Sequence, residues 1–261
     1  MADLFPLQGR AVRVADDQDT LASAAASVVL ACAMATPPDG ELTVALSGGR
    51  TPRRLHSLLA TPPLSNVIPW ARVVFLLGDE RCVPPDHAES NFGMVQQTLV
   101  SRLPEGTARV HRVQAEQGPD PAAALYEEVV RDVVKRRLDG VPSLDLVFLG
   151  VGEDGHTASL FPGGPALSEA TRLVAPVAGD GSRPARVTFT LRLLNASKLV
   201  VFLVSGSSKA AVVKRALEPG DRPDPLPCQR VKPVSGAVLW LLDRAAAASL
   251  AGATLAGLVE Q

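Results

Sequence analysis

The sequence is poor in cysteine. Its 261 residues include only Cys32, Cys82 and Cys228, and no two of these lie close together. Without a CxxC pair there is no sign of a zinc site, and an odd, scattered set does not indicate a disulfide framework. Such cysteine usage is typical of a reducing compartment. We therefore expect a cytoplasmic protein.

An excess of charge of one sign is also missing. Lys and Arg number 26 and Asp and Glu number 27, so the formal net charge is −1. No overall field then draws the protein to nucleic acid or to an acidic membrane. An anionic substrate would have to be held by a local cluster of donors. The expected partner is a small molecule. The sequence does not fix the oligomeric state, although a monomer is favoured.

Long apolar runs are lacking as well. The most apolar early stretch, Leu21–Ala35, is rich in alanine and too short to cross a bilayer. Asp16, Asp17 and Asp19 precede it, where a signal peptide would carry positive charge. The same acids suit the first turn of a helix. We expect an amphipathic helix here and no membrane span.

What the sequence does contain is an alternation of apolar runs and helix-like stretches. Hydrophobic residues make up 46% and charged residues 20%, as in a folded protein. The apolar runs are nearly continuous, which is typical of parallel strands buried on both faces. The alternation predicts an α/β fold with an open, doubly wound, mostly parallel sheet and helices on both faces.

No fixed-period repeat or flexible linker is visible, so we expect a single domain over residues 1–261. The helix predicted from Pro121 has Asp120 as its cap and Pro121 at its first position. Strands are expected at Leu42–Leu46, Arg72–Leu77, Leu144–Leu149 and Lys198–Val204; helices at Pro52–Ala60, Ser90–Leu103, Pro121–Leu138 and Ser208–Leu217; and loops at Ala60–Pro69, Gly179–Pro184 and Glu218–Pro233.

In open α/β sheets the ligand binds beyond the carboxyl ends of the strands, so the residues after each strand matter most. The first strand is followed by Ser47, Gly48, Gly49, Arg50 and Thr51, and then by a proline. The glycines let the backbone approach a ligand, and Thr51 resembles a helix cap before proline at the first helical position. Free N–H groups there would suit a phosphate. A tight turn without a ligand explains the same residues, and the spacing is not that of a Walker loop.

A second small-residue turn follows the last strand. It runs from Ser205 through Gly206 to Lys209 and leads into a helix. Its N–H groups and the lysine charge could hold a phosphate, although an exposed lysine at a helix start is common. Two such turns after strands of one sheet can converge on one anion.

Three consecutive charges, Asp79, Glu80 and Arg81, follow the second strand directly. A surface turn would explain them without any function. Alternatively, the carboxylates could orient sugar hydroxyls while the guanidinium stabilises an oxyanion.

The third strand is followed by a glycine-rich segment, Gly150–Thr157, whose spacing matches the dinucleotide fingerprint GxGxxG. The context contradicts that interpretation. Glu153 and Asp154 would set two negative charges against a pyrophosphate, and Pro162 cuts short the helix that should follow.

His156 lies in this glycine-rich segment, two residues after Asp154. A neutral imidazole can take a proton from water at physiological pH, and Asp154 could orient the ring. A structural histidine is the alternative, and we assign His56, His87 and His111 to surface or packing positions. The sequence contains no GxSxG elbow, and no cysteine lies in a catalytic context, although Cys82 follows Arg81. We therefore expect water to be the nucleophile.

Taken together, these segments resemble the 6-phosphogluconolactonase family, within a wider group that includes glucosamine-6-phosphate deaminases. The resemblance covers nearly the whole chain. It runs through Leu46–Pro52, Gly78–Pro84 with Ser90-Asn91, Gly150–Pro162, Arg186–Thr188 with Leu194-Asn195, and Ser205–Lys209.

The resemblance implies a NagB-like domain that hydrolyses a sugar 6-phosphate lactone without metal or nucleotide. It implies that Ser47–Thr51 and Lys209 bind the phosphate with the help of Arg186, and that His156 is the general base. We add Asp154, Asp79, Arg81 and Gly155 as catalytic or substrate-binding residues. The deaminase relatives carry a glutamate five residues after the histidine, where this chain has Phe161, and that difference favours the lactonase.

Two alternatives remain at this stage. An aminosugar-phosphate deaminase or isomerase would share the fold, and so would a non-catalytic sugar-phosphate sensor. The chain has no spare residues or basic stretch for the DNA-binding helix that sensors carry.

Overall fold

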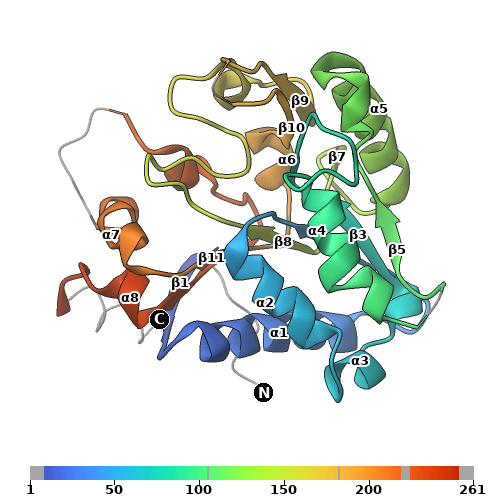
Figure 1. Ribbon diagram of the computed structural model, residues 1–261, viewed down its shortest axis with the longest axis horizontal. Helices are drawn as coiled ribbons and strands as arrows, with labels where there is room; N and C mark the ends of the chain where they lie inside the picture. Colours follow the sequence, from blue (N-terminus) through green and yellow to red (C-terminus); the bar gives the residue numbers. More distant parts are fainter. Residues whose placement is uncertain (1–8, 105, 182, 219–223, 253–261) are drawn as a thin grey trace.

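The computed structural model describes residues 9–104, 106–181, 183–218 and 224–252. Strands and helices alternate along the chain as predicted (Figure 1). The strands are β1 (Gly9–Ala15), β2 (Leu42–Leu46), β3 (Val73–Leu77), β4 (Asp79–Arg81), β5 (Arg109–His111), β6 (Arg137–Leu138), β7 (Val141–Pro142), β8 (Leu146–Leu149), β9 (Val174–Val177), β10 (Arg186–Phe189), β11 (Leu199–Val204) and β12 (Ala237–Asp243). The α-helices are α1 (Gln18–Ala35), α2 (Arg50–Leu59), α3 (Leu64–Val67), α4 (Asn91–Thr98), α5 (Pro119–Val133), α6 (Leu191–Leu194), α7 (Ala210–Leu217) and α8 (Arg244–Ala247).

Seven strands form one central sheet in the order β1-β12-β11-β8-β2-β3-β5. Every neighbouring pair in it is parallel. Every residue of β2, β3, β8 and β11 is buried, because helices or loops cover both faces of the sheet. The predicted parallel α/β fold and its four strands are therefore confirmed.

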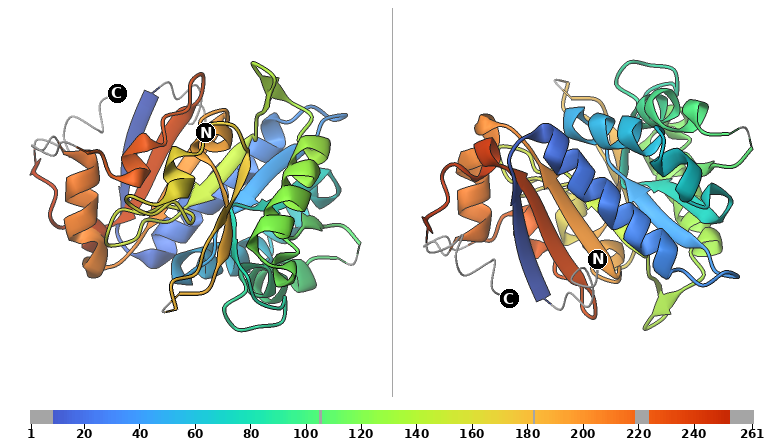
Figure 2. Two further views of the ribbon diagram at one scale, coloured as in Figure 1. Left: turned by 90° about the horizontal axis from the view of Figure 1, so that it is seen from above. Right: turned by 90° about the horizontal axis from the view of Figure 1, so that it is seen from below.

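Helices α1 and α2 lie across one face of the central sheet, and α5 and the short strands lie over the other (Figure 2). By length and composition α1 would be long and apolar enough to cross a membrane. Residues such as Leu21, Val28 and Val29 are instead buried against the sheet. Asp17 caps the helix by accepting hydrogen bonds from the N–H groups of Asp19 and Thr20, and Asp19 lies in the first turn as expected.

A second sheet, β4-β10-β9, is small and antiparallel. β4 consists of Asp79, Glu80 and Arg81, and both carboxylates are buried. The three charges are therefore not a surface turn. This sheet continues from the carboxyl end of β3, the side of an open α/β sheet at which ligands usually bind.

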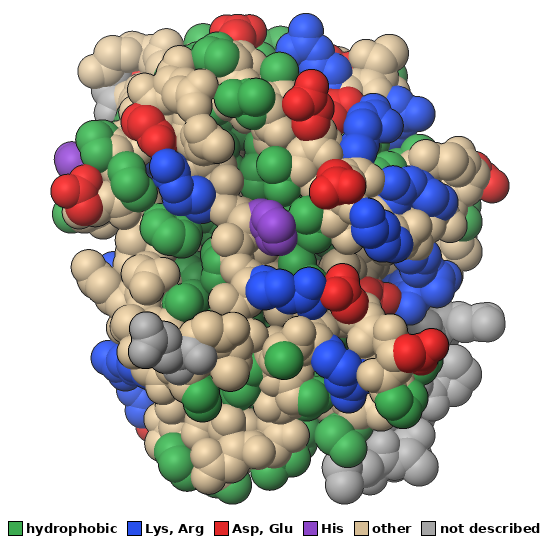
Figure 3. Space-filling model, turned by 90° about the vertical axis from the view of Figure 1, so that its right-hand side faces the viewer, with side chains coloured by type: hydrophobic (Ala, Val, Ile, Leu, Met, Phe, Trp, Pro, Cys, Tyr) green, Lys and Arg blue, Asp and Glu red, His purple; other side chains and the backbone are tan. Residues whose placement is uncertain are grey.

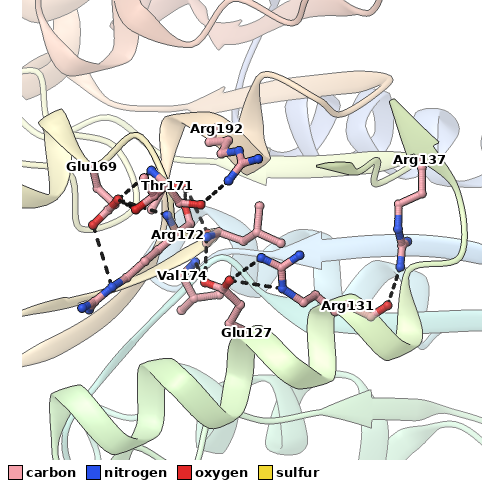
Figure 4. Close-up of polar contacts among 10 residues, drawn as sticks. Glu127, Arg131, Arg137, Glu169, Thr171, Arg172, Val174 and Arg192 are labelled. Atoms are coloured by element: carbon pink, nitrogen blue, oxygen red, sulfur yellow. Dashed lines mark hydrogen bonds and ion pairs between the residues drawn. The ribbon is translucent and has the colours of Figure 1, made fainter. Parts of the chain in front are cut away.

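The outer face of α5 holds mixed charges, and cations and anions are interspersed around it in Figure 3. Glu127 of this helix pairs with Arg131 at 2.6 Å and also accepts the N–H groups of Leu173 and Val174 (Figure 4). These bonds hold α5 against the start of β9, which is an edge strand of the small sheet.

Several predicted boundaries are wrong. Helix α5 starts at Pro119 after Gly118 and ends at Val133, so Asp120 is not its cap. Residues 137–138 pair with 141–142 as a short hairpin instead of continuing the helix. Helix α2 starts at Arg50, with Gly49 as its N-cap in place of Thr51. The expected loop at 60–69 contains α3, and the described part of 218–233 contains a 3₁₀ turn; positions 182 and 219–223 of the predicted loops lie outside the described residues.

Candidate active site

Three predicted loops meet at the carboxyl edge of the central sheet because they follow neighbouring strands. β8 lies between β11 and β2 in the sheet. The segment after β8 therefore emerges between the two small-residue turns. A cavity of about 500 Å³ lies there, lined by both turns, by Gly150 and Val151, and by Gln18 at the start of α1. Both turns therefore line the same cavity, and the expectation that they bind one anion stays a prediction.

The turn after β2 exposes backbone donors to this cavity. Gly49 has φ of 106°, and no side chain caps the ten-residue helix α2, so its first N–H groups are available to an anion. Gly48 packs so closely on Asn91 that a Cβ there would lie 1.8 Å from its Oδ1. The Ser47 hydroxyl is buried without a hydrogen-bond partner among the described residues. A ligand oxygen would satisfy it.

The turn after β11 is joined directly to the first one. The hydroxyls of Thr51 and Ser205 lie 2.8 Å apart, within hydrogen-bond distance. Gly206 has φ of 95°, which favours glycine, and its N–H donates to both carboxylate oxygens of Asp243 at 3.1 and 3.0 Å. Lys209 closes the short 3₁₀ turn that leads into α7 and lines the cavity. Arg50 also lines it from the first position of α2.

Asp154 holds His156 in a defined orientation. Its Oδ1 accepts the His156 backbone N–H at 3.0 Å and lies 2.6 Å from the imidazole Nδ1. An ionised carboxylate only accepts, so Nδ1 carries the proton and Nε2 is the free base. Partial burial acts to raise the pKa of Asp154, but the His156 N–H and ring outweigh it and the pKa is lowered. Asp154 therefore stays ionised and stabilises the ring when it is protonated.

The glycines around His156 serve packing. A Cβ on Gly152 would lie 2.1 Å from the His156 Nδ1, so this position requires glycine. Gly152 also donates its N–H to the His156 carbonyl at 2.8 Å and closes the loop. Gly155 has φ of 89° and packs on Leu226. The glycine spacing that matches GxGxxG is therefore explained by the packing of Gly152 and Gly155 in the loop that holds His156.

Side chains alternate along β4 and divide its three charges between two tasks. Glu80 faces α4: it accepts the backbone N–H groups of Asn91 and Phe92 at 2.8 Å each. Burial raises the pKa of the Glu80 carboxyl. Asp79 and Arg81 lie on the opposite face of the strand and reach the start of α4 through the Asn91 side chain. Asp79 accepts the Ser159 hydroxyl at 2.7 Å, and Arg81 donates to the Asn91 Oδ1 at 3.1 Å, leaving its buried Nε without a partner among the described residues.

Arg186 approaches the histidine loop from the small sheet. It lies opposite Arg81 in the β4–β10 pairing, and its Nη1 is 3.9 Å from the Asp79 Oδ2. Its guanidinium also lies 5.8 Å from the ring centre of Phe161, whose ring is 4.7 Å from the His156 ring. Arg81, Asp79 and Arg186 do not line the 500 Å³ cavity. Asn91 links Asp79 and Arg81 to Gly48, which lines the cavity. Phe161 links Arg186 to His156, whose side chain lies outside the cavity lining.

The sequence matches one family model over residues 15–240, described as glucosamine-6-phosphate isomerases and 6-phosphogluconolactonase. The chain belongs to this family. Within the family, it is 42% identical over 211 residues to the 6-phosphogluconolactonase of Rattus norvegicus, covering 80% of each chain. It is 35% identical to the 6-phosphogluconolactonase of Nostoc sp., covering 92% of this chain and 98% of the relative.

A solved structure of the family, 6-phosphogluconolactonase from Leishmania guyanensis, superposes with a TM-score of 0.84 at 27% identity. The match covers 94% of this chain and all of the other. Family membership accords with the resemblance stated from the sequence.

Four residues of the site carried no role in the sequence analysis: Asn91, Ser159, Asp243 and Gln18. Asn91 belonged to a motif that we quoted, but its bond to Asp79 and its contact with Gly48 join segments more than ten residues apart. Ser159 and Asp243 likewise act across the fold. Among the described residues no cluster of His, Cys, Asp or Glu could hold a metal ion.

Proposed function

We propose that this protein hydrolyses 6-phospho-D-glucono-1,5-lactone to 6-phosphogluconate, a step of the oxidative pentose phosphate pathway. The observation that carries this proposal is the Asp154–His156 pair in the loop that emerges between the two small-residue turns lining the cavity. A base beside a phosphate cradle suits a substrate with a reactive carbonyl at one end and a phosphate at the other. The relatives from Rattus norvegicus and Nostoc sp. are both named 6-phosphogluconolactonase, and the matches cover 80% and 98% of their lengths.

The phosphate binds first in this account. Backbone N–H groups at the start of α2 and the Lys209 ammonium surround it in the cavity, and the buried Ser47 hydroxyl lies just before the residues that line it. Net charge contributes little, because the whole chain carries only −1. Binding the remote phosphate fixes the lactone so that its C1 faces the histidine loop. Holding the reactants in place lowers the entropic part of the barrier.

His156 then acts as the general base. Its Nε2 takes a proton from water while the water oxygen forms a bond to C1, and the carbonyl electrons move to oxygen. Arg81 and nearby backbone N–H groups stabilise that oxyanion. The intermediate collapses, the bond from C1 to the ring oxygen breaks, and His156 returns its proton to that oxygen. The net change adds one water across the ester and leaves His156 neutral.

The proposal is tested by following the loss of 6-phosphogluconolactone at neutral pH against its spontaneous hydrolysis. Unphosphorylated gluconolactone is the matched control substrate. We expect strong acceleration for the phosphorylated lactone and little for the other. Failure to accelerate either lactone would remove the lactonase proposal.

A deaminase is the second candidate, and the environment of His156 weighs against it. The position five residues later is Phe161, whose ring packs beside the imidazole and carries no carboxylate. Ammonia release from glucosamine 6-phosphate would support the deaminase; binding of sugar phosphate with no turnover would support a sensor.

We also propose that the protein works in the cytoplasm. The three cysteines are free thiols, and Cys32 and Cys228 are buried. Cell fractionation with an antibody tests this, and recovery from a secreted or membrane fraction would contradict it.

A further inference from the structure

Asp243 lies at the carboxyl end of β12, outside every motif that the sequence analysis singled out. Its side chain is buried, with 3% of its surface exposed. The carboxylate accepts three hydrogen bonds: two from the single N–H of Gly206, at 3.1 and 3.0 Å, and one from the N–H of Ala246 at 2.7 Å. No Lys or Arg side chain within the described ranges pairs with it. Among the described residues, the donors to this carboxylate are therefore backbone N–H groups.

The bond to Ala246 is an ordinary helix cap, since Asp243 is the N-cap of α8. The bonds to Gly206 are different. They join β12 to the turn after β11, 37 residues earlier in the chain. Both carboxylate oxygens are used, so the orientation of the Gly206 peptide is fixed relative to the sheet.

This orientation determines which donors of the turn face the phosphate cavity. Gly206 has φ of 95° and its N–H points away to Asp243, so the peptide cannot offer that group to a ligand. The donor groups of this turn that a ligand could use belong to Ser207–Lys209, and these residues line the cavity. On the opposite side, Ser205 is held by the Thr51 hydroxyl at 2.8 Å. The turn is thus held from both sides.

We propose that Asp243 is a positioning residue for the substrate phosphate: it holds the 205–209 turn in its binding conformation and gives the enzyme its preference for phosphorylated lactones. This inference rests on the proposed function and assigns a residue to its binding step. Asp243 takes no part in the chemistry at C1. Its loss should therefore raise KM and leave kcat nearly unchanged.

Two variants separate the positioning role from the helix cap. Asp243→Ser keeps an N-cap oxygen for Ala246 but is too short to hold Gly206. Asp243→Asn keeps one acceptor oxygen that can serve both N–H groups. For Asp243→Ser we expect KM for 6-phosphogluconolactone to rise about tenfold, as for the loss of a charge-assisted hydrogen bond, with kcat within about threefold. Asp243→Asn should restore KM to within about threefold of the natural enzyme.

Asp145→Ser is the matched control. Asp145 is also a carboxylate of the central sheet and accepts the Thr43 N–H at 3.0 Å, but it lies just before β8, at the amino end of the sheet. This variant should lower the melting temperature and leave KM unchanged. A purely structural role for Asp243 predicts the same pattern for Asp243→Ser, and that result would overturn the proposal.

Binding of 6-phosphogluconate and of inorganic phosphate, measured by calorimetry, gives a readout independent of turnover. Weaker binding of both ligands to Asp243→Ser, with normal binding to Asp145→Ser, supports the positioning role even if the natural enzyme hydrolyses no lactone. Unchanged binding to Asp243→Ser contradicts that role whatever the reaction is.

Discussion

The phosphate turns and the histidine loop are built in opposite ways. The turns come from distant parts of the chain, after β2 and β11, and in the proposed mechanism they bind the phosphate through backbone N–H groups and a lysine. The histidine loop is one short segment after β8, and its key bond joins residues only two positions apart. Close packing is common to both regions, because neither Gly48 of the first turn nor Gly152 of the loop has room for a methyl group. In the proposed mechanism, substrate binding therefore depends on long-range positioning, and proton transfer depends on local geometry.

This division predicts that binding and chemistry can be damaged separately. Changes in the histidine loop should reduce kcat, changes in the turns should raise KM, and a change in packing behind the turns should affect mainly stability.

The largest effect is expected for His156→Ala. Loss of the general base should reduce kcat by about 10²–10⁴ while phosphate affinity stays nearly intact. Steady-state kinetics and calorimetry with 6-phosphogluconate measure the two quantities. His87→Ala, which changes an exposed histidine, should leave both unchanged. A His156→Ala enzyme with full turnover would refute the assignment of the base.

Gly152→Ala should come next. The added methyl would sit 2.1 Å from the His156 Nδ1 and must displace the ring from Asp154. A displacement of about 1 Å in a catalytic group can cost roughly a hundredfold in kcat. Gly78→Ala is the control, because a Cβ there meets only the Leu46 carbonyl at an ordinary 3.6 Å. Equal activity of the two variants would show that the loop tolerates movement.

Lys209→Met tests the turns. Removing a charge-assisted contact to the phosphate should raise KM about 10- to 100-fold, with kcat nearly constant. Lys214→Met lies on the adjoining helix α7, where the side chain pairs with Glu218, and should leave KM unchanged. A fall in kcat without a change in KM for Lys209→Met would contradict the separation of the two regions.

The smallest effect on activity is expected at His56, which packs α2 behind the first turn. It is fully buried, and burial lowers its pKa to about 4 from an ordinary value of 6.5, with Arg53 contributing. Below pH 6.5 the His56 imidazole binds a proton in the unfolded chain, whereas in the folded protein it stays neutral until the pH falls to about 4. Stability conferred by neutral His56 is therefore present above pH 6.5 and is lost as the pH falls, by at most about 3 kcal/mol.

Urea unfolding at pH 7 and pH 4.5 measures this loss. His56→Asn should weaken the pH dependence, and His87→Asn should retain it in full. The same acid sensitivity in all three proteins would show that His56 is not its source.

The sequence was sufficient for the features that are local. Continuous apolar runs such as Val73–Leu77 marked the buried parallel strands, and the Asp154–His156 spacing marked a bond that the structure contains. β12 is just as apolar and could have been recognised from Ala237–Leu242. β4 and β10 could not, because strands of three or four residues with charged side chains have no pattern of their own.

The missed site residues share a physical reason. Asn91, Ser159 and Asp243 act through contacts that depend on how the sheets pack, and nothing near them in sequence shows those contacts. The wrong helix starts have another cause. Gly49 and Gly118 begin α2 and α5 through positive φ angles of 106° and 93°, whereas the pattern of cap and proline favoured Thr51 and Asp120.

The most direct test of the account is a crystal structure of the protein with 6-phosphogluconate. We expect the phosphate between the Ser47–Thr51 and Ser205–Lys209 turns and the C1 carboxylate within hydrogen-bond distance of the His156 Nε2. A product bound in the reverse direction, or a phosphate outside the cavity between the two turns, would contradict the division of binding and chemistry between these regions.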